Sequence, residues 1–285
     1  MTDLLLNQTN GWLRRLDLKA RKRMGQNFLV DRQVLEEVVD AAEITGDDTI
    51  IEIGPGLGVL TRELAQKAGR VIAVEKDDRL AAMLAQELAS FNNLKIINQD
   101  ILKIKPIDLF GGQTDRYKVV ANLPYYITSA VLRYFLEAAP KPELMVVMLQ
   151  KEVADNIVAA DGRMSLLSIS VWFYGKPQII DYVPAACFHP PPQVDSAILK
   201  IDVYAKPAVE VGDINGFFNL IRAAFSASRK QLPNSLAQGL GVSKDETLPM
   251  LEEAGITSKR RAETLALEEW QKLWQVFSRR NNDKT

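Results

Sequence analysis

Short apolar runs rich in β-branched residues alternate with amphipathic stretches over the first two thirds of the chain. Between Asp31 and about Asp202, each run has the length and composition of a buried strand. These runs are Thr49–Ile53, Arg70–Glu75, Leu94–Asn98, Lys118–Ala121, Leu144–Leu149, Gln178–Val183 and Ala197–Val203. Strands that alternate with helices predict crossover units, and therefore a mostly parallel sheet covered on both faces.

Three polar residues mark where helices of this region are expected to begin. Asp31, Asp77 and Thr128 stand at the start of amphipathic stretches, where a side-chain oxygen can cap backbone N–H groups. The last two strand runs follow each other without a clear helix, which predicts an antiparallel hairpin at one edge of the sheet. The loop between these runs, Pro184–Gln193, is rich in proline and is therefore expected to be stiff.

After about Lys206 the strand pattern stops and helical patterns follow. The expected helices are Ile214–Phe225, a region around Gln231–Gln238 interrupted by Pro233, Lys244–Glu253, and Leu267–Arg279. An Ala-Lys-Pro stretch at 205–207 has the composition of a linker. We therefore predict an α/β domain over residues 1–205 and a small all-α domain over residues 206–285.

The composition is that of a folded globular protein, and it excludes several kinds of chemistry. The 285 residues are 47% hydrophobic and 25% charged, so the chain can bury enough surface to fold. One cysteine, Cys187, excludes an internal disulfide framework and a thiolate metal cluster, which fits a reducing compartment. One histidine, His189, argues against histidine-based triads and histidine-ligated zinc. We expect no metal site.

No segment of the sequence has the pattern of a membrane anchor or a signal peptide. The first ten residues lack a basic region followed by an apolar core, and the charge-free apolar stretch 164–175 is too short to cross a bilayer. We therefore expect a cytoplasmic protein with no membrane association.

A glycine-rich turn follows the first strand of the predicted sheet. Gly54, Gly56 and Gly58 let the backbone turn tightly and approach a ligand closely, and Glu52 precedes them. The next strand ends at Glu75, where a carboxylate can accept hydrogen bonds from the two hydroxyls of an adenosine ribose. This spacing predicts a nucleoside-containing cofactor; a glycine turn without function is the alternative.

The order E-x-G-x-G-x-G differs from the G-x-G-x-x-G of dinucleotide sites, which brings a helix N-terminus onto a pyrophosphate. It resembles motif I of class I methyltransferases, whose cofactor S-adenosylmethionine has no phosphate to hold. In that interpretation Asp100, at the end of the third strand, reaches the exocyclic amine of the adenine and Ile101 packs near the ring. A solvated carboxylate at a strand end is the alternative for Asp100.

The fourth strand ends in Asn122-Leu123-Pro124-Tyr125, a combination suited to binding an amine. The Asn122 side-chain oxygen and the Leu123 carbonyl can both accept hydrogen bonds from one amino group, which directs its lone pair at an electrophile. Pro124 fixes the backbone, and Tyr125 can stack on the base that carries the amine. Methyl transfer from a sulfonium needs positioning more than histidine or cysteine. An ordinary turn after a strand is the alternative.

In these motifs and their order, the chain resembles the ribosomal RNA adenine N6,N6-dimethyltransferases (the KsgA family), with the Erm methyltransferases as relatives. The resemblance runs over nearly the whole chain. It rests on the segments G25-Q-N-F-L29, E52-I-G-P-G-L-G58, E75-K-D77, Q99-D100, N122-L-P-Y-Y-I127, F188-H-P-P-P-Q-V-D-S-A197, F225-S-A-S-R-K230 and G255-I-T-S-K-R-R-A-E-T-L265. The triple-proline segment and the R-A-E-T-L end look more like KsgA than Erm.

The resemblance implies a Rossmann-like class I methyltransferase domain followed by a small all-α domain that docks RNA or the ribosome. It implies contacts with S-adenosylmethionine from Asn27, Leu29, Gly54, Gly56, Glu75, Asp100 and Asn122. It also implies that Asn122, Leu123, Pro124 and Tyr125 bind the target amine and base, and that Phe188 stacks on the other face of the adenine.

Two observations limit what the resemblance carries. Phe188 could equally be a core residue beneath the loop, and Cys187 with His189 lacks the orienting acid of a catalytic pair. The segment A160-D-G-R-M-S-L-L-S168 departs from the family pattern, because it is shorter than the family's usual loop and lacks its tyrosine.

The formal net charge of −1 hides an uneven distribution. Residues 1–31 carry a basic excess, residues 47–115 carry an acidic one, and two further basic clusters lie at Arg222/Arg229/Lys230 and Lys259–Arg261. Phosphate binding depends on local basic density, so an RNA substrate fits this chain. Of these clusters, the N-terminal one is the strongest candidate for RNA contact.

The leading hypothesis is a monomeric enzyme that dimethylates N6 of two adjacent adenines near the 3′ end of 16S rRNA in the small ribosomal subunit, with a role in subunit biogenesis. One alternative is an Erm-type adenine methyltransferase that acts on 23S rRNA. Another is a non-catalytic RNA-binding assembly factor with the same fold.

Overall fold

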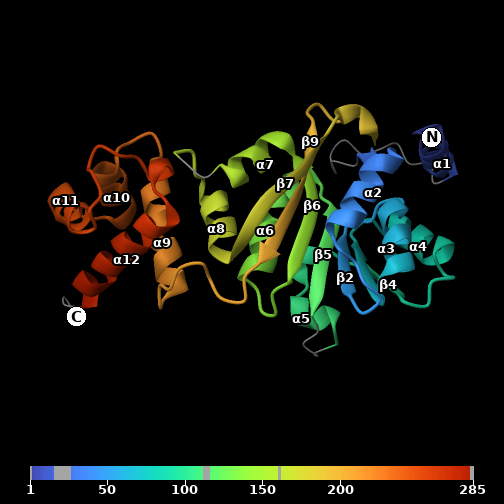
Figure 1. Ribbon diagram of the computed structural model, residues 1–285, viewed down its shortest axis with the longest axis horizontal. Helices are drawn as coiled ribbons and strands as arrows, with labels where there is room; N and C mark the ends of the chain where they lie inside the picture. Colours follow the sequence, from blue (N-terminus) through green and yellow to red (C-terminus); the bar gives the residue numbers. More distant parts are fainter. Residues whose placement is uncertain (1, 16–26, 112–115, 160–161, 283–285) are drawn as a thin grey trace. The chain divides into compact units, whose positions relative to one another are not determined.

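The structure is a computed structural model that describes residues 2–15, 27–111, 116–159 and 162–282 (Figure 1). The chain divides into two compact units. The first consists of Met1–Asp155 and Lys176–Ala205, and the second of Asn156–Gly175 and Lys206–Thr285.

The first unit is built on one mixed sheet. Among the described residues it has seven strands in the order β4-β3-β2-β5-β6-β9-β7. The strands are β2 (Thr49–Ile53), β3 (Arg70–Glu75), β4 (Leu94–Asn98), β5 (Tyr117–Asn122), β6 (Leu144–Gln150), β7 (Gly175–Val183) and β9 (Ser196–Val203). The pairs from β4 to β6 are parallel, and β9 runs antiparallel to β6. The predicted α/β architecture is confirmed, and β7 and β9 are neighbours at one edge.

The apolar runs become strands because both faces of the sheet are covered. Every residue of β2 is buried, and Val119, Val120 and Ala121 of β5 have no exposed surface. Parallel strands covered on both faces tolerate few polar residues, which explains runs without alternation. Glu52, near the end of β2, is the exception, and it lines a pocket at the carboxyl end of the sheet.

The described helices of the first unit precede β2 or connect the strands. They are α1 (Thr2–Arg15), α2 (Arg32–Ala41), α3 (Val59–Lys67), α4 (Asp78–Glu87), α5 (Pro106–Leu109) and α6 (Thr128–Glu137), with short 3₁₀ turns η2 (Ile101–Lys103), η3 (Tyr125–Ile127) and η4 (Ala185–Cys187). Helix α7 (Lys151–Val158) begins in this unit and ends in the second. Figure 1 shows these helices alternating with the strands along the colour gradient.

The expected helix caps are confirmed at two of three positions. Asp31 accepts hydrogen bonds from the N–H groups of Gln33 and Val34, and Asp77 accepts one from Arg79. The prediction for Thr128 was wrong. Because the turn η3 runs directly into α6, Ile127 is the capping position and Thr128 is the first helical residue, with its hydroxyl buried and without a hydrogen-bond partner.

The proline-rich loop contains a short strand that the sequence did not reveal. Strand β8 (Phe188–His189) pairs antiparallel with β1 (Phe28–Leu29), so that Leu29 faces Phe188. The Val30 N–H also donates to the Cys187 carbonyl at 2.9 Å. The loop is therefore tied to the segment that precedes α2.

The second unit is helical in its described residues. It contains α8 (Leu166–Tyr174), α9 (Ile214–Phe225), α10 (Leu232–Leu240), α11 (Lys244–Glu253), η5 (Ala262–Thr264) and α12 (Leu267–Asn282). Pro233 does not interrupt α10, because it lies in the first turn, where a missing N–H costs nothing.

The chain crosses from the first unit to the second between residues 205 and 206, where a domain boundary was predicted. The second unit also includes Asn156–Gly175, which the prediction had placed in the first. The reason is the apolar helix α8. Its Phe173 stacks on Phe217 of α9 at 5.4 Å between ring centroids and meets Phe218 edge-on at 5.2 Å. The apolar stretch 164–175, too short to cross a bilayer, therefore contributes to the core of the helical unit.

No described helix has the length and apolar character needed to cross a membrane.

Candidate functional site

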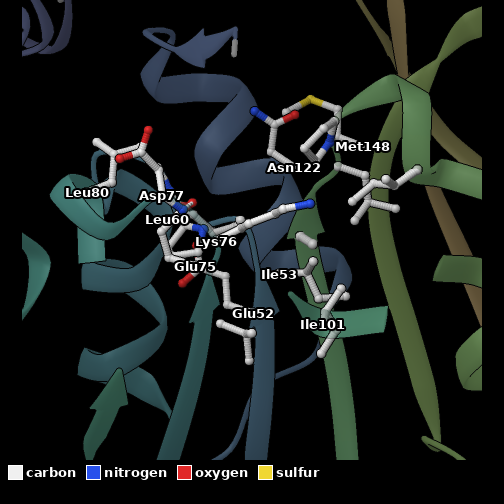
Figure 2. A pocket seen from close by; sticks show the side chains of 18 of the residues that line it. Glu52, Ile53, Leu60, Glu75, Lys76, Asp77, Leu80, Ile101, Asn122 and Met148 are labelled. Carbon is white, nitrogen blue, oxygen red and sulfur yellow. Dashed lines mark hydrogen bonds between the residues drawn. The ribbon is translucent and has the colours of Figure 1, made fainter. Parts of the chain in front are cut away.

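A pocket lies in the first unit at the carboxyl ends of β2, β3 and β5 (Figure 2). This is where open α/β sheets place their ligands. Every predicted cofactor and target-amine residue except Phe188 lines it: Asn27, Leu29, Gly54, Gly56, Glu75, Asp100, Asn122, Leu123, Pro124 and Tyr125. The structure thus brings together residues that are spread over almost a hundred positions.

The glycine turn between β2 and α3 requires glycine for two physical reasons. Gly54, Gly56 and Gly58 all have positive φ, between 59° and 76°. A Cβ on Gly58 would also lie 2.5 Å from Cδ2 of Leu84, and one on Gly56 would lie 3.1 Å from the Phe28 ring. A side chain is therefore strained at all three positions and crowded at Gly56 and Gly58, and the backbone of Gly54 and Gly56 lines the pocket.

Glu75, at the end of β3, is fixed by backbone donors. The Gly56 N–H donates to Oε2 at 3.1 Å, and the Asp77 N–H donates to Oε1 at 2.8 Å. Burial raises the pKa of this carboxyl, while these N–H groups act in the opposite direction. Each oxygen retains a lone pair for a further donor, which suits a ligand that carries hydroxyls.

Glu52 is a pocket residue whose importance sequence reasoning missed. It is 1% exposed, and Oε2 has no hydrogen-bond partner among the residues that the structure describes. Burial raises its pKa to about 8, and the charge of Glu75 adds to the effect. The available signal was a carboxylate inside the otherwise apolar run Thr49–Ile53.

Asp100 forms an ion pair at the pocket with Lys76. The Lys76 Nζ donates to Oδ2 at 2.9 Å, while the Leu102 N–H donates to Oδ1 at 3.1 Å. The ion pair lowers the pKa of Asp100. Figure 2 shows the Lys76 side chain extended across the pocket. Sequence reasoning gave no role to Lys76, since a lysine after a strand is ordinary surface.

The corner formed by Asn122–Tyr125 is held by contacts to three other segments. The Asn122 side-chain N–H donates to the Asn27 carbonyl at 3.2 Å, which leaves the amide oxygen to face away from that partner. The Leu123 N–H donates to the Met148 carbonyl of β6 at 3.1 Å. The Tyr125 hydroxyl lies 2.8 Å from the hydroxyl of Ser196. The corner is thus a fixed arrangement and not a loose turn.

Phe188 is not among the pocket-lining residues. It is 3% exposed and packs in a core cluster with Leu29 and Val38. This placement agrees with the alternative of a core residue, and its stacking on a target base stays a prediction. Burial and Asp31 raise the pKa of the neighbouring Cys187 thiol, which agrees with its exclusion as a nucleophile.

Some predicted features lie outside the described residues. These are Gly25 and Gln26 of the N-terminal motif, most of the basic N-terminal cluster including Lys19 and Lys22, and the start of the shortened loop at Ala160. Within the described part, no group of three or more histidine, cysteine or acidic residues is arranged to hold a metal ion.

The model of the family described as "Ribosomal RNA adenine dimethylase" matches residues 17–278 of the chain. The chain belongs to this family. Among curated relatives, two proteins named "Ribosomal RNA small subunit methyltransferase A" illustrate the similarity. The one from Dehalococcoides mccartyi is 52% identical, over 97% of this chain and 95% of the relative. The one from Alkaliphilus metalliredigens is 41% identical, over 94% and 95%.

Solved structures agree with membership in the dimethylase family. The 23S rRNA methyltransferase ErmE is 29% identical with a TM-score of 0.70, covering 88% of this chain and all of its own. A dimethyladenosine transferase from Plasmodium falciparum is 25% identical with a TM-score of 0.74, covering 89% and 98%. The family and the class I methyltransferase fold implied by the sequence resemblance are confirmed, and the higher identities lie on the KsgA side.

Proposed function

We propose that this rRNA adenine dimethylase uses S-adenosylmethionine to dimethylate N6 of two adjacent adenines near the 3′ end of 16S rRNA. The substrate is the small ribosomal subunit or its precursor, and the modification contributes to subunit biogenesis. One observation carries the proposal: the glycine turn, Glu75, Asp100 and the Asn122–Tyr125 corner line a single pocket. Such a pocket holds a nucleoside cofactor beside an amine acceptor.

The pocket residues fit S-adenosylmethionine. The bare turn at Gly56 admits a nucleoside closely, and Glu75 has acceptors free for the ribose hydroxyls. Asp100 can accept from the adenine amine, and Asn27 and Leu29 line the same pocket. When bound, the cofactor supplies a methyl group that its sulfonium already activates. The protein's task is then positioning.

The chemistry of the acceptor follows from the corner. The Asn122 amide oxygen and the Leu123 carbonyl accept hydrogen bonds from the target amino group, which takes its lone pair out of conjugation. Pro124 has no N–H and fixes the backbone here, while the Tyr125 ring stacks on the base. The proton lost by the amine leaves to water. Holding reactants in a near-attack geometry supplies most of the acceleration.

The second unit offers a surface for RNA docking. The Leu232 N–H donates to the Arg260 carbonyl at 2.8 Å, which joins the segment 229–232 to the segment 259–261. Arg229, Lys230, Lys259 and Arg261 are all exposed on these two segments, which together we call the basic segment pair. Clustered exposed cations bind the phosphate backbone. We assign the helical unit to docking of the rRNA, and expect a cytoplasmic monomer.

The test is methylation of unmodified ribosomal subunits by the purified protein with labelled S-adenosylmethionine. We expect two dimethylated adjacent adenines in the small-subunit rRNA. Label in the large-subunit rRNA alone would support the Erm-type alternative, which is considered because of the similarity to ErmE. Asn122→Ala should lower turnover at least about a hundredfold; an unchanged turnover would support the non-catalytic assembly factor.

A further inference from the structure

Two residues at the start of β9 form hydrogen bonds with several elements around the Asn122–Tyr125 corner. The Asp195 carboxylate accepts a hydrogen bond from the Ala185 N–H at 2.9 Å, and its carbonyl accepts one from the Lys151 N–H at 3.0 Å. The next residue, Ser196, has its hydroxyl 2.8 Å from the hydroxyl of Tyr125. The resemblance assigned no role to Ser196, which lies in the triple-proline segment F188-H-P-P-P-Q-V-D-S-A197.

Ser196 is a rigid anchor. It has no exposed surface, and its backbone is part of the sheet, where it pairs with Gln150 of β6. A hydrogen bond at the tip of a tyrosine fixes the position of its hydroxyl, and therefore the direction in which the ring projects, once the backbone is fixed. Tyr125 is itself only partly buried and lines the pocket. Without this bond the ring could tilt toward solvent.

We infer that Ser196 is a positioning residue, which holds the Tyr125 ring at the place where the target adenine stacks. The inference rests on the proposed function, because it assumes that Tyr125 meets the acceptor base. Ser196 acts through Tyr125 and not through the cofactor, since it is not among the residues that line the pocket. The cost of removing it should therefore fall on methyl transfer and not on cofactor binding.

The hydroxyl pair can be broken from either side, which gives a double-mutant cycle. Ser196→Ala and Tyr125→Phe each remove the same hydrogen bond, and Tyr125→Phe keeps the aromatic ring. We expect each to lower kcat on small-subunit rRNA about five- to tenfold, the range expected for one hydrogen bond. The kcat of the double variant should be no more than about twofold below that of the less active single variant, because the same hydrogen bond can be lost only once.

The control is Ser170→Ala in the helical unit. Ser170 is also buried, at 1% exposed, but its hydroxyl has no hydrogen-bond partner in the described part of the chain. We expect this variant to keep wild-type turnover. The cofactor Kd, measured by calorimetry, should stay within about twofold for all variants, and thermal unfolding midpoints identify any variant that fails to fold. The ratio of monomethyl to dimethyl adenine should rise in Ser196→Ala, because the bulkier monomethylated base needs the same placement.

The outcomes separate this inference from the proposed function. Wild-type protein that transfers no methyl group to rRNA overturns the proposed function, and the inference with it. With an active wild type, three results overturn the inference alone: turnover of Ser196→Ala within about twofold of wild type, losses that multiply in the double variant, or a cofactor Kd that weakens as much as turnover falls.

Discussion

Glu52 and Glu75 lie on adjacent strands, yet their surroundings differ sharply. Both oxygens of Glu75 accept backbone N–H donors, whereas Oε2 of Glu52 has none. A buried carboxyl with too few donors holds its proton, because the charged form has lost its water and gained little in return. At neutral pH the pocket therefore contains one carboxyl that is mostly neutral.

Glu52 should make stability depend on pH in a specific window. Its pKa is about 8 in the folded protein, against 4.5 for an exposed glutamate. Between these values the folded state binds the extra proton, so the stability contribution of Glu52 falls as pH rises from about 4.5 to about 8. Glutamine cannot ionise. We expect Glu52→Gln to gain stability relative to wild type over this window, by about 5 kcal/mol in total.

Urea unfolding of both proteins from pH 5 to pH 9 measures this difference. Only the change with pH matters, because any cost of the buried amide is the same at every pH. A stability difference that stays constant across the range contradicts the assignment.

The ion pair of Lys76 with Asp100 gives a second prediction at the scale of residues. Lys76→Met removes the ammonium that lowers the pKa of Asp100, so this pKa should rise toward its ordinary value. When the affinity for the cofactor is measured against pH, its loss on the acid side should begin at a higher pH. Carboxyl-carbon NMR titration measures the pKa directly. Lys95→Met, at an exposed lysine of β4, should leave it unchanged.

At the scale of elements, most strands and helices could be predicted from the spacing of hydrophobic residues. The side chains that an element buries recur with the period of that element. Strand β3 and helix α9 have the predicted bounds. The β1–β8 pair could not be predicted, since it rests on two residues from each partner with no periodicity. The pocket residues of the motifs were found because their order is specific. Glu52 was missed because the burial of its carboxyl depends on elements that are distant in sequence, and Lys76 because its partner Asp100 lies 24 positions away.

The glycine turn is the element most sensitive to substitution. Gly58→Ala combines a left-handed backbone with a Cβ 2.5 Å from Leu84, whereas Gly111→Ala has a similar φ of 71° and open space. We expect Gly58→Ala to lower the free energy of unfolding by about 3 kcal/mol and Gly111→Ala by about 1 kcal/mol. Denaturant unfolding measures both. Equal losses would mean that the contact with Leu84 carries no cost.

At the scale of the whole molecule, the pocket and the basic segment pair belong to different units. Substitutions at the pocket should therefore affect cofactor binding with little effect on rRNA binding, and substitutions in the basic segment pair should do the reverse. The domain prediction drawn from the end of the strand pattern missed Asn156–Gly175, because an apolar helix reads the same whether it packs on a sheet or on other helices.

Removing charge from the basic segment pair should weaken rRNA binding alone. For Arg229→Ala combined with Lys259→Ala, we expect the slope of log affinity against log salt to shrink by about 1 to 2, since each lost phosphate contact changes it by about 0.7 to 0.9. The cofactor Kd should not change. Filter binding at several salt concentrations measures the slope. Lys272→Ala, at an exposed lysine of α12, is the control, and an equal change there would argue against a localised contact.

The pairing of Leu29 with Phe188 has a consequence for how the protein is made. One wall of the pocket comes from a segment near the start of the chain, and it is secured by a strand about 160 residues later. Contacts this distant in sequence form late, because the intervening chain must be ordered first. During synthesis the amino-terminal strands can therefore fold without a complete pocket. The nascent chain gains its full affinity for the cofactor only after residue 189 has left the ribosome, a particle whose small subunit is the proposed substrate of the finished enzyme.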